Sequence, residues 1–537
     1  MADMFARYPS GGPAHDEMVD SSGAVRPSYA ALHETLRGLG PEELHNIAES
    51  LASNYFDAGV TFDVGGVERP FPLDVVPRIL AEQEWETIST GVAQRVRALE
   101  AFLGDVYGRQ SLLTDEVIPR RLITSSTHYQ RAVHGVAPPN GVRIHVAGID
   151  LIRTPQGDVR VLEDNVRVPS GVSYVMTNRQ AMVSALPGAF RHTRIRPVSG
   201  YPQRLLAALR AARPTGVDDP TVVVLTPGVY NSAYFEHTLL ARSMGVELVE
   251  GRDLVCRRGR VYMRTTQGLR RVDVIYRRVD DDFLDPVHFR PDSMLGVPGL
   301  VNAVRTGGVV LANALGNGVA DDKLLYTYVP DLIKYYLGEE PIIANVDTWR
   351  LEEPDAREEV LDRLDELVVK PVDGSGGKGI VIGPFATAEE LAALRERVLA
   401  EPRGWIAQPL VQLSTVPTLV DDEIAPRHVD LRPFAVNNGD EVWVLPGGLT
   451  RVALPEGELI VNSSRGGGSK DTWVVAGRAG GAAEGEVTDT TPGTVRPEHI
   501  VAPSVPRPEG ESMDASHTEQ VQQQQQHHDQ DEGVASC

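Results

Sequence analysis

A glycine-rich loop between two strand-like runs restricts the fold of this chain more than any other feature. Residues 367–371 are apolar around Lys370, and residues 380–382 are apolar again. Between them lie four glycines and a second lysine: Gly374, Gly376, Gly377, Lys378 and Gly379. Glycines let the backbone approach a ligand closely, and successive N–H groups can surround an anion. A plain hairpin turn rarely needs this composition, so the pattern predicts a loop that covers phosphate.

Three named phosphate loops compete for this stretch. A Walker A loop needs Ser or Thr after Gly-Lys, but Lys378 is followed by Gly379. The spacing of Gly374, Gly376 and Gly379 satisfies G-x-G-x-x-G, yet a dinucleotide loop must open a helix and here a strand follows. With Val381 the stretch also fits the protein-kinase loop. A kinase places its lysine on the strand after the loop, whereas Lys370 precedes it and no D-F-G follows.

A second constraint is an acidic hairpin far earlier in the chain. Residues 148–153 and 159–165 flank a Pro/Gly turn and read as paired strands, which would place Asp150 beside Glu163. Asn165 leaves the same strand face as Glu163, because side chains alternate along a strand. Two carboxylates and an amide oxygen form an all-oxygen cluster suited to Mg²⁺. Surface carboxylates on an ordinary hairpin are the alternative.

Composition limits the class of protein. A chain of 537 residues can hold several packed units. Its net charge of −22 argues against nucleic-acid binding, which needs a basic surface. Cys256 and Cys537 are too few for a disulfide framework or a zinc site. There is neither an N-terminal targeting pattern nor a run near the ~18 apolar residues of a membrane span, so a cytoplasmic protein without membrane association is expected.

The chain divides into segments of different character. Residues 1–27 are rich in Gly, Pro and Ser and are expected to be mobile. Helices are predicted from Pro41 and over residues 85–107, the latter with a core stripe of Val92, Val96, Leu99 and Leu103. From residue 221 a strand–loop–helix–strand order predicts a parallel α/β layer, with further strands at 275–276 and 309–312.

Two further stretches remain. Arg277 and Arg278, beside Asp280–Asp282, could steer an acidic substrate or form a local salt-bridge network. From residue 479 the composition becomes that of a disordered acidic and Gln-rich tail, with eleven acids and two arginines from residue 481 onward, a net of −9.

A strand lysine followed by a glycine flap between two strands resembles the ATP-grasp superfamily. Such enzymes carry an earlier lysine, often in a D-K pair, and Asp322-Lys323 lies 47 positions before Lys370. They carry a hinge that binds adenine, matched by residues 405–410 with Gln408 in place of the commoner glutamate, and Leu410. They also carry basic residues near the γ-phosphate, matched by Arg432 and Arg451 as catalytic candidates.

The order of these parts is rotated. In the usual arrangement the magnesium segment, an acid and then E-x-N, would follow Arg451. Here it is Asp150, Glu163 and Asn165, far upstream. The chain therefore resembles the circularly permuted ATP-grasp family of many uncharacterised bacterial proteins, distantly similar to glutathionylspermidine synthetase-type ligases. The resemblance covers most of residues 30–478.

The resemblance implies an architecture of α/β and α+β units. A helical segment with the permuted metal-binding strands would occupy residues 28–190, and a pre-ATP-grasp α/β layer residues 191–318. The ATP-grasp nucleotide-binding lobes would occupy residues 319–478, ahead of the tail at 479–537.

It also implies ATP and Mg²⁺ as cofactors and a ligase reaction. A carboxylate would attack the γ-phosphate, and an amine or thiol would capture the acylphosphate, releasing ADP and phosphate. The substrates would be small molecules or peptides carrying a carboxylate and an amine. A phosphotransferase on the same fold and a nucleotide-binding partner protein without turnover are the alternatives. Nothing in the sequence selects the substrates or the oligomeric state.

Overall fold

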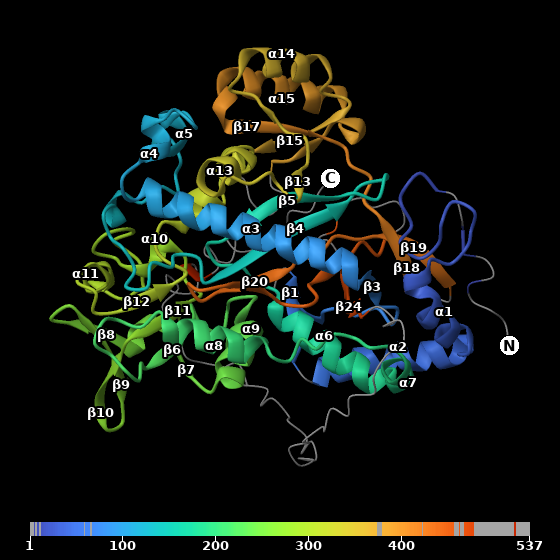
Figure 1. The fold of residues 1–537 in the computed structure, drawn as a ribbon, viewed down its shortest axis with the longest axis horizontal. Coiled ribbons are helices and arrows are strands. Elements are labelled where there is room, and N and C mark those ends of the chain that lie inside the picture. Colours follow the sequence, from blue (N-terminus) through green and yellow to red (C-terminus); the bar gives the residue numbers. More distant parts are fainter. Residues whose placement is uncertain are drawn as a thin grey trace.

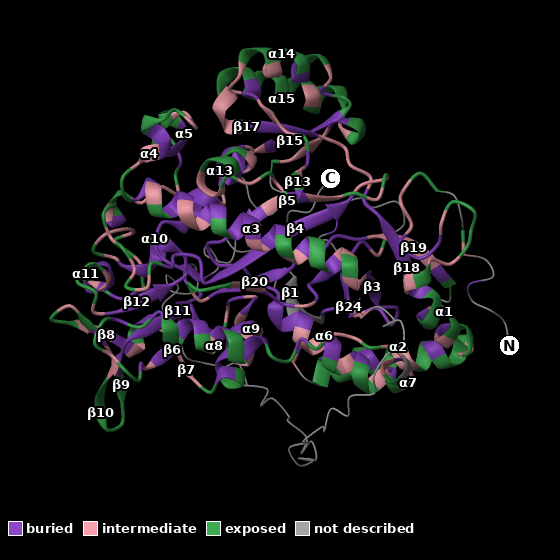
Figure 2. Cartoon of the chain, in the orientation of Figure 1, coloured by how far each residue is buried: buried purple, intermediate pink, exposed green. Residues whose placement is uncertain are grey.

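The computed structural model describes residues 5, 8–9, 12–57, 59–64, 67–372, 379–421, 423–455, 461, 467–476 and 520–521. These residues form layers in which helices cover several sheets (Figure 1). The central strands are buried, and exposed residues concentrate on the outward faces of helices (Figure 2). Within the described ranges, no helix has both the length and the apolar character needed to cross a membrane.

A five-stranded sheet unites distant parts of the chain. Its order is β13 (Ala344–Asn345), β5 (Val159–Asn165), β4 (Val146–Arg153), β20 (Phe434–Asn437) and β21 (Val442–Val444). The predicted hairpin is confirmed as antiparallel β4 and β5, with Asp150 paired to Glu163. Strand β20 pairs antiparallel with β4. The early hairpin thus completes a sheet whose other strands come from the second half of the chain, which is the permutation that the motif order predicts.

The long helix α3 (Glu82–Val106) runs across this sheet (Figure 1). Its inward stripe consists of the predicted residues Val92, Val96, Leu99 and Leu103, each no more than 1% exposed. The apolar residues recur with helical spacing and pack against the sheet, which stabilises the helix.

The predicted α/β layer is also confirmed. Its four strands are parallel throughout, in the order β12 (Val310–Ala312), β11 (Val274–Arg277), β6 (Val222–Leu225) and β7 (Glu247–Val249). Helices α8 (Tyr201–Ala211) and α9 (Tyr234–Met244) pack beside it.

Arg277, the last residue of β11, and Arg278, which follows it, both form salt bridges. Arg277 donates to the carbonyl oxygens of Asn313, at 2.8 Å, and Ala314, at 3.0 Å, and it pairs with Asp281. Arg278 is buried against Glu236. Arg277 thus has a local salt-bridge partner, whereas the partner of Arg278 lies 42 positions earlier in the chain.

A smaller antiparallel sheet forms the lobe at the top of Figure 1. Its order is β14 (Trp349–Arg350), β17 (Trp405–Pro409), β15 (Leu367–Pro371) and β16 (Val381–Ile382), covered by α14 (Pro354–Asp362) and α15 (Ala388–Ala400). Strands β15 and β16 pair antiparallel. The glycine loop therefore joins two strands, as the sequence predicts, although residues 373–378 lie outside the described part of the chain.

The N-terminal stretch expected to be mobile, residues 1–27, has buried residues in its described part. Glu17 is 5% and Met18 1% exposed. The Glu17 carboxylate accepts hydrogen bonds from Arg78 and Arg153, which lie far along the chain. This segment is packed although it has few apolar residues. Its partners are distant in the sequence, and local composition does not reveal them.

The remaining elements complete the layers. The other helices are η1 (Pro27–Tyr29), α1 (Ala30–Arg37), α2 (Pro41–Asp57), α4 (Ser111–Thr114), α5 (Arg120–Thr124), η2 (Arg131–Val133), α6 (Val172–Ala185), α7 (Pro187–His192), η3 (Gly251–Asp253), α10 (Asp281–Leu284), α11 (Leu300–Arg305), η4 (Asn317–Ala320), α12 (Lys323–Tyr326), α13 (Val329–Leu337), η5 (Gly383–Phe385) and η6 (Pro402–Gly404). The other strands are β1 (Thr61–Val64), β2 (Val67–Pro70), β3 (Arg78–Ala81), β8 (Leu254–Arg257), β9 (Arg260–Thr265), β10 (Gly268–Val272), β18 (Thr415–Val420), β19 (Glu423–His428), β22 (Thr450–Val452), β23 (Gly468–Lys470) and β24 (Thr472–Val475).

The predicted tail, residues 479–537, lies outside the described residues except for Gln520 and Val521. Gln520 accepts a hydrogen bond from the backbone N–H of Met294 at 2.6 Å, and Val521 is buried. This contact returns the C-terminal part of the chain to the body at one point.

Candidate functional site

One small cavity lies where the five-stranded sheet meets the upper lobe. It is lined by Leu162, Glu163, Asp321, Lys323, Tyr326, Lys370, Ile406 and Gln408. Four of these, Glu163, Lys323, Lys370 and Gln408, are residues that the sequence predicts for a nucleotide and metal site. They come from β5, α12, β15 and β17, so only the tertiary fold brings them together.

Two lysines and two acids supply the charges of this cavity. Lys323 is the first residue of α12, which begins after the N-cap Asp322, and its Nζ lies 3.3 Å from Glu163 Oε1. Lys370 projects from β15 and is 2% exposed. Ammonium groups withdrawn from water are costly unless they meet negative charge. The wall of the cavity thus presents ammonium groups beside the carboxylates of Glu163 and Asp321.

Gln408 lies on β17 and is 3% exposed. Its Nε2 donates to Thr348 Oγ1 at 2.9 Å, which fixes the orientation of the amide. Leu410 follows the strand, is half-buried, and does not line the cavity. Gly379 has a φ of +78°, a left-handed conformation that favours glycine. The other predicted loop residues, Gly374, Gly376, Gly377 and Lys378, lie outside the described residues.

A buried cluster of four charges carries both predicted catalytic arginines. Asp150 is 0% exposed, and its Oδ1 accepts from Arg432 Nε at 2.5 Å. Its Oδ2 accepts from Arg432 Nη2 and from Arg451 Nη2, both at 2.9 Å. Arg451 Nη2 also donates to Asp430 Oδ2 at 2.6 Å. Both arginines are therefore oriented by carboxylates with almost no contact with solvent.

The two acids of this cluster differ in their pKa. Burial raises the pKa of Asp150, but attraction by Arg432 and Arg451 outweighs burial and holds it below its ordinary value. Burial raises the pKa of Asp430 above its ordinary value, because Arg451 compensates only part of the lost hydration and Asp150 repels it. Asp150 is thus the more firmly ionised of the two.

The predicted metal ligands lie on paired strands but have different partners. Asp150 faces the arginines, whereas Glu163 faces Lys323. Asn165 is 5% exposed, and its Nδ2 has no hydrogen-bond partner within the described ranges. Those ranges contain no group of three or more His, Cys, Asp or Glu side chains that could hold a metal ion. The oxygens of Glu163 and Asn165 fit Mg²⁺, whereas Asp150 would first have to exchange an arginine.

Sequence reasoning missed one acid that lines the cavity and one arginine that contacts this acid. Asp321 lines the cavity and accepts the backbone N–H of Val166 at 2.8 Å and of Arg167 at 3.2 Å. Arg167 Nε lies 3.9 Å from Asp321 Oδ2 and 3.8 Å from Asp280 Oδ1. The acid before the Asp322-Lys323 pair could have indicated Asp321. No local pattern marks Arg167, because its acidic neighbours are more than 100 positions away.

Comparisons with known proteins identify the family. Residues 77–453 match the circularly permuted ATP-grasp type 2 family. An uncharacterized protein of Mycobacterium tuberculosis is 62% identical over 470 residues, covering 88% of this chain and 85% of that protein. An uncharacterized protein of Synechocystis is 52% identical over 470 residues, covering 87% of this chain and 98% of that protein.

Two further comparisons concern a named relative and a solved structure. The Frankia casuarinae protein named "Putative glutamate--cysteine ligase 2-2" is 48% identical over 475 residues, which is 88% of this chain but only 54% of that protein. The structure of a glutathione synthetase-like effector from Globodera pallida shares the fold at a TM-score of 0.54 and 10% identity, covering 81% of this chain and 98% of its own.

The permuted sheet and the cavity residues agree with the family that the sequence indicates. ATP-grasp ligases generally use ATP and Mg²⁺, and the charged cavity is consistent with that use. The chain belongs to the circularly permuted ATP-grasp type 2 family.

Proposed function

We propose that this protein is an Mg·ATP-dependent ligase that joins a carboxylate to an amine or a thiol. The reaction passes through an acylphosphate and releases ADP and phosphate. The observation that carries the proposal is the cavity in which Glu163, Lys323, Lys370 and Gln408 meet, beside the arginine cluster. Phosphoryl transfer mainly requires alignment and charge neutralisation, which these residue types supply without a covalent nucleophile.

Each predicted residue has a role in this proposal. Lys323 and Lys370 neutralise the phosphates, and Arg432 and Arg451 hold the phosphoryl group in transfer. Gln408 and Leu410 belong to the hinge that holds the adenine, Gln408 from the wall of the cavity and Leu410 from outside it. The glycine loop covers the phosphates. Its residues in this role are Gly374, Gly376, Gly377, Lys378 and Gly379. Asp150, Glu163 and Asn165 would hold Mg²⁺, which would supply charge neutralisation for the phosphates.

The arginine cluster suggests how Asp150 becomes available. Arg432 and Arg451 are satisfied by carboxylates in the structure. The charged oxygens of a phosphate can bind these guanidinium groups with a geometry similar to that of a carboxylate. An incoming anion would therefore compete with Asp150 for the arginines.

The cavity residues provide the first test. Lys370→Met is expected to weaken Mg·ATP binding roughly 10- to 100-fold, the equivalent of ~1.5–3 kcal/mol for one charge-assisted contact. Glu163→Gln is expected to reduce the rate of Mg²⁺-dependent ADP release strongly. The melting temperature of this variant is expected to change little. The matched control is Lys334→Met, which removes an exposed lysine whose side chain is 53% exposed. Titration calorimetry measures the binding, and retained activity in Glu163→Gln would refute its metal role.

The reaction type needs a second experiment. The name of the Frankia relative makes glutamate with cysteine the first pair to incubate with Mg·ATP, followed by other carboxylates and amines. We expect a condensed product together with equal amounts of ADP and phosphate, resolved by mass. A stable phosphorylated product without free phosphate would instead establish a phosphotransferase.

A further inference from the structure

We propose that Glu17, in the N-terminal segment outside the family match at residues 77–453, is a positioning residue for the two catalytic arginines. It acts through Arg78, which reaches the strand region that orients Arg451. This inference rests on the proposed function in one respect: it assigns Glu17 a task in the same arginine cluster.

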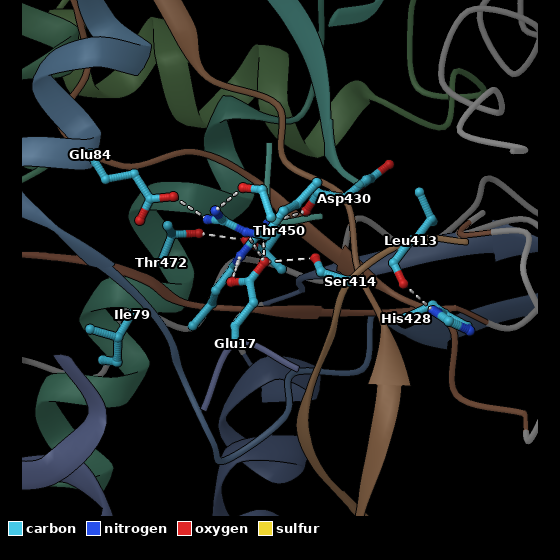
Figure 3. A network of polar contacts seen from close by, with 12 residues as sticks. Glu17, Ile79, Glu84, Leu413, Ser414, His428, Asp430, Thr450 and Thr472 are labelled. Atoms are coloured by element: carbon cyan, nitrogen blue, oxygen red, sulfur yellow. Dashed lines mark hydrogen bonds and ion pairs between the residues drawn. The ribbon is translucent and has the colours of Figure 1, made fainter. Parts of the chain in front are cut away.

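The Glu17 carboxylate joins three separate parts of the chain (Figure 3). Its Oε2 accepts from Arg78 Nε at 2.8 Å. Its Oε1 accepts from Arg78 Nη2 at 2.6 Å, from Arg153 Nε at 2.9 Å and from Ser414 Oγ at 2.7 Å. Burial alone would raise the pKa of Glu17, but Arg78 and Arg153 together with these hydrogen bonds hold it well below its ordinary value. The carboxylate is therefore ionised and shared by donors from β3, from β4 and from the residue before β18.

One route leads directly from Glu17 to the arginine cluster. Arg78 uses its remaining terminal nitrogen, Nη1, to donate to the backbone oxygen of Asp430 at 2.9 Å. The Asp430 carboxylate accepts from Arg451 Nε at 2.9 Å and from its Nη2 at 2.6 Å. Arg451 in turn contacts Asp150. The position of Arg78 therefore sets the backbone on which Asp430 orients Arg451.

A second route passes through the strand that carries Asp150. Arg153 lies three residues further along β4, and its backbone oxygen accepts from Ser414 N at 3.1 Å. The oxygen of Ser414 accepts from Val429 N at 3.0 Å, next to Asp430. Glu17 thus connects both the β4 strand and the segment leading to Asp430.

The backbone holds this segment in place independently of the Glu17 carboxylate. Glu17 N donates to Thr415 O at 2.9 Å, and Thr415 N donates to His15 O at 2.9 Å. The Asp16 carboxylate accepts from Met18 N at 2.9 Å. A neutral side chain at position 17 can therefore keep the segment docked while leaving two adjacent guanidiniums without their shared negative charge. Repulsion between them would move Arg78 away from Asp430.

The test compares Glu17→Gln with Glu84→Gln in the full-length chain. Glu84 is the matched control, because it also pairs with Arg153 but does not contact Arg78. Glu17→Gln is expected to lower kcat for Mg·ATP turnover, read as ADP release, roughly 10- to 100-fold with less than a threefold change in KM for ATP, as expected when a transition-state interaction is lost. Glu84→Gln is expected to keep kcat within threefold. An equal loss in both variants, or a loss in KM alone, would overturn the proposal.

A second variant and a second readout keep the test decisive. Ser414→Ala removes only one hydrogen bond to Glu17 and should lower kcat by a smaller factor in a folded protein. Amide hydrogen exchange over residues 428–434 and 450–452 should be faster in Glu17→Gln than in Glu84→Gln. Unchanged exchange there would overturn the positioning role, whereas absence of ADP release in the unmodified chain would contradict the proposed function and leave the exchange experiment to decide on Glu17.

Discussion

Glu100 on α3 shows how one carboxyl group links the stability of this chain to pH. It accepts the backbone N–H groups of Arg143 at 2.8 Å and Ile144 at 2.7 Å. Burial nevertheless raises its pKa from 4.5 to about 7, because the two backbone N–H groups and the nearby Arg143 charge do not replace its hydration. The folded state therefore retains a proton that the unfolded chain has released.

The sign of the effect follows from this difference. Between pH 4.5 and about 7 the folded state binds more protons than the unfolded chain, so the free energy of unfolding falls as the pH rises. The total is on the order of 3 kcal/mol, at ~1.4 kcal/mol for each unit of pKa shift. Glu100→Gln should flatten this slope, measured by urea unfolding at a series of pH values. An unchanged slope would contradict the assignment to Glu100.

At the scale of elements, a buried lysine joins the end of the body to its beginning. Strand β24 pairs parallel with β3. Just before it, Lys470 is 0% exposed and donates from Nζ to the Asp74 carboxylate, to Val76 O at 3.0 Å and to Pro417 O at 2.8 Å. Burial lowers the pKa of Lys470, although Asp74 opposes that shift. All three donors of the ammonium group are used.

Lys470→Met should be strongly destabilising. It leaves Asp74, 8% exposed, without its cation, and breaking a buried pair from one side costs ~3–5 kcal/mol. Adding Asp74→Asn should recover part of this loss, because the uncompensated charge is then removed. The control is Lys334→Met at the exposed pair with Glu340, expected to cost less than ~1 kcal/mol. Chemical unfolding measures each variant, and equal losses at the two lysines would contradict the role of burial.

At the scale of the whole molecule, the family match is smaller than the folded unit. The family match at residues 77–453 excludes Glu17, Asp74, Lys470 and β24. Each of these forms a hydrogen bond, a salt bridge or a strand pair with another part of the folded chain. A fragment of residues 77–453 is therefore expected to lack cooperative unfolding. A fragment of residues 12–476 should unfold cooperatively and bind Mg·ATP, as measured by thermal circular dichroism and calorimetry. Cooperative folding of the shorter fragment would show that these contacts are dispensable.

Much of this architecture could be predicted because its signals are local. The stripe from Val92 to Leu103 has helical spacing, and the hairpin with Asp150 and Glu163 has alternation and a turn. The loop beside Lys370 follows one strand and precedes another. The order of these parts along the chain was enough to indicate a permuted ATP-grasp fold. Each motif can be recognised from a few neighbouring residues, and the order of the motifs is then read directly from the sequence.

The partners of individual side chains were decided by the tertiary structure. Asp150 reads as a metal ligand, yet its contacts are arginines 282 and 301 positions away, one in the segment before β20 and the other on β22. Glu17 reads as part of a mobile end, yet Arg78 and Arg153, 61 and 136 positions away, hold it in the interior. The sequence by itself determined the elements, the motifs and their permuted order. Only the packing of distant strands decided which charges meet, because a carboxylate's partner depends on three-dimensional proximity that no local pattern encodes.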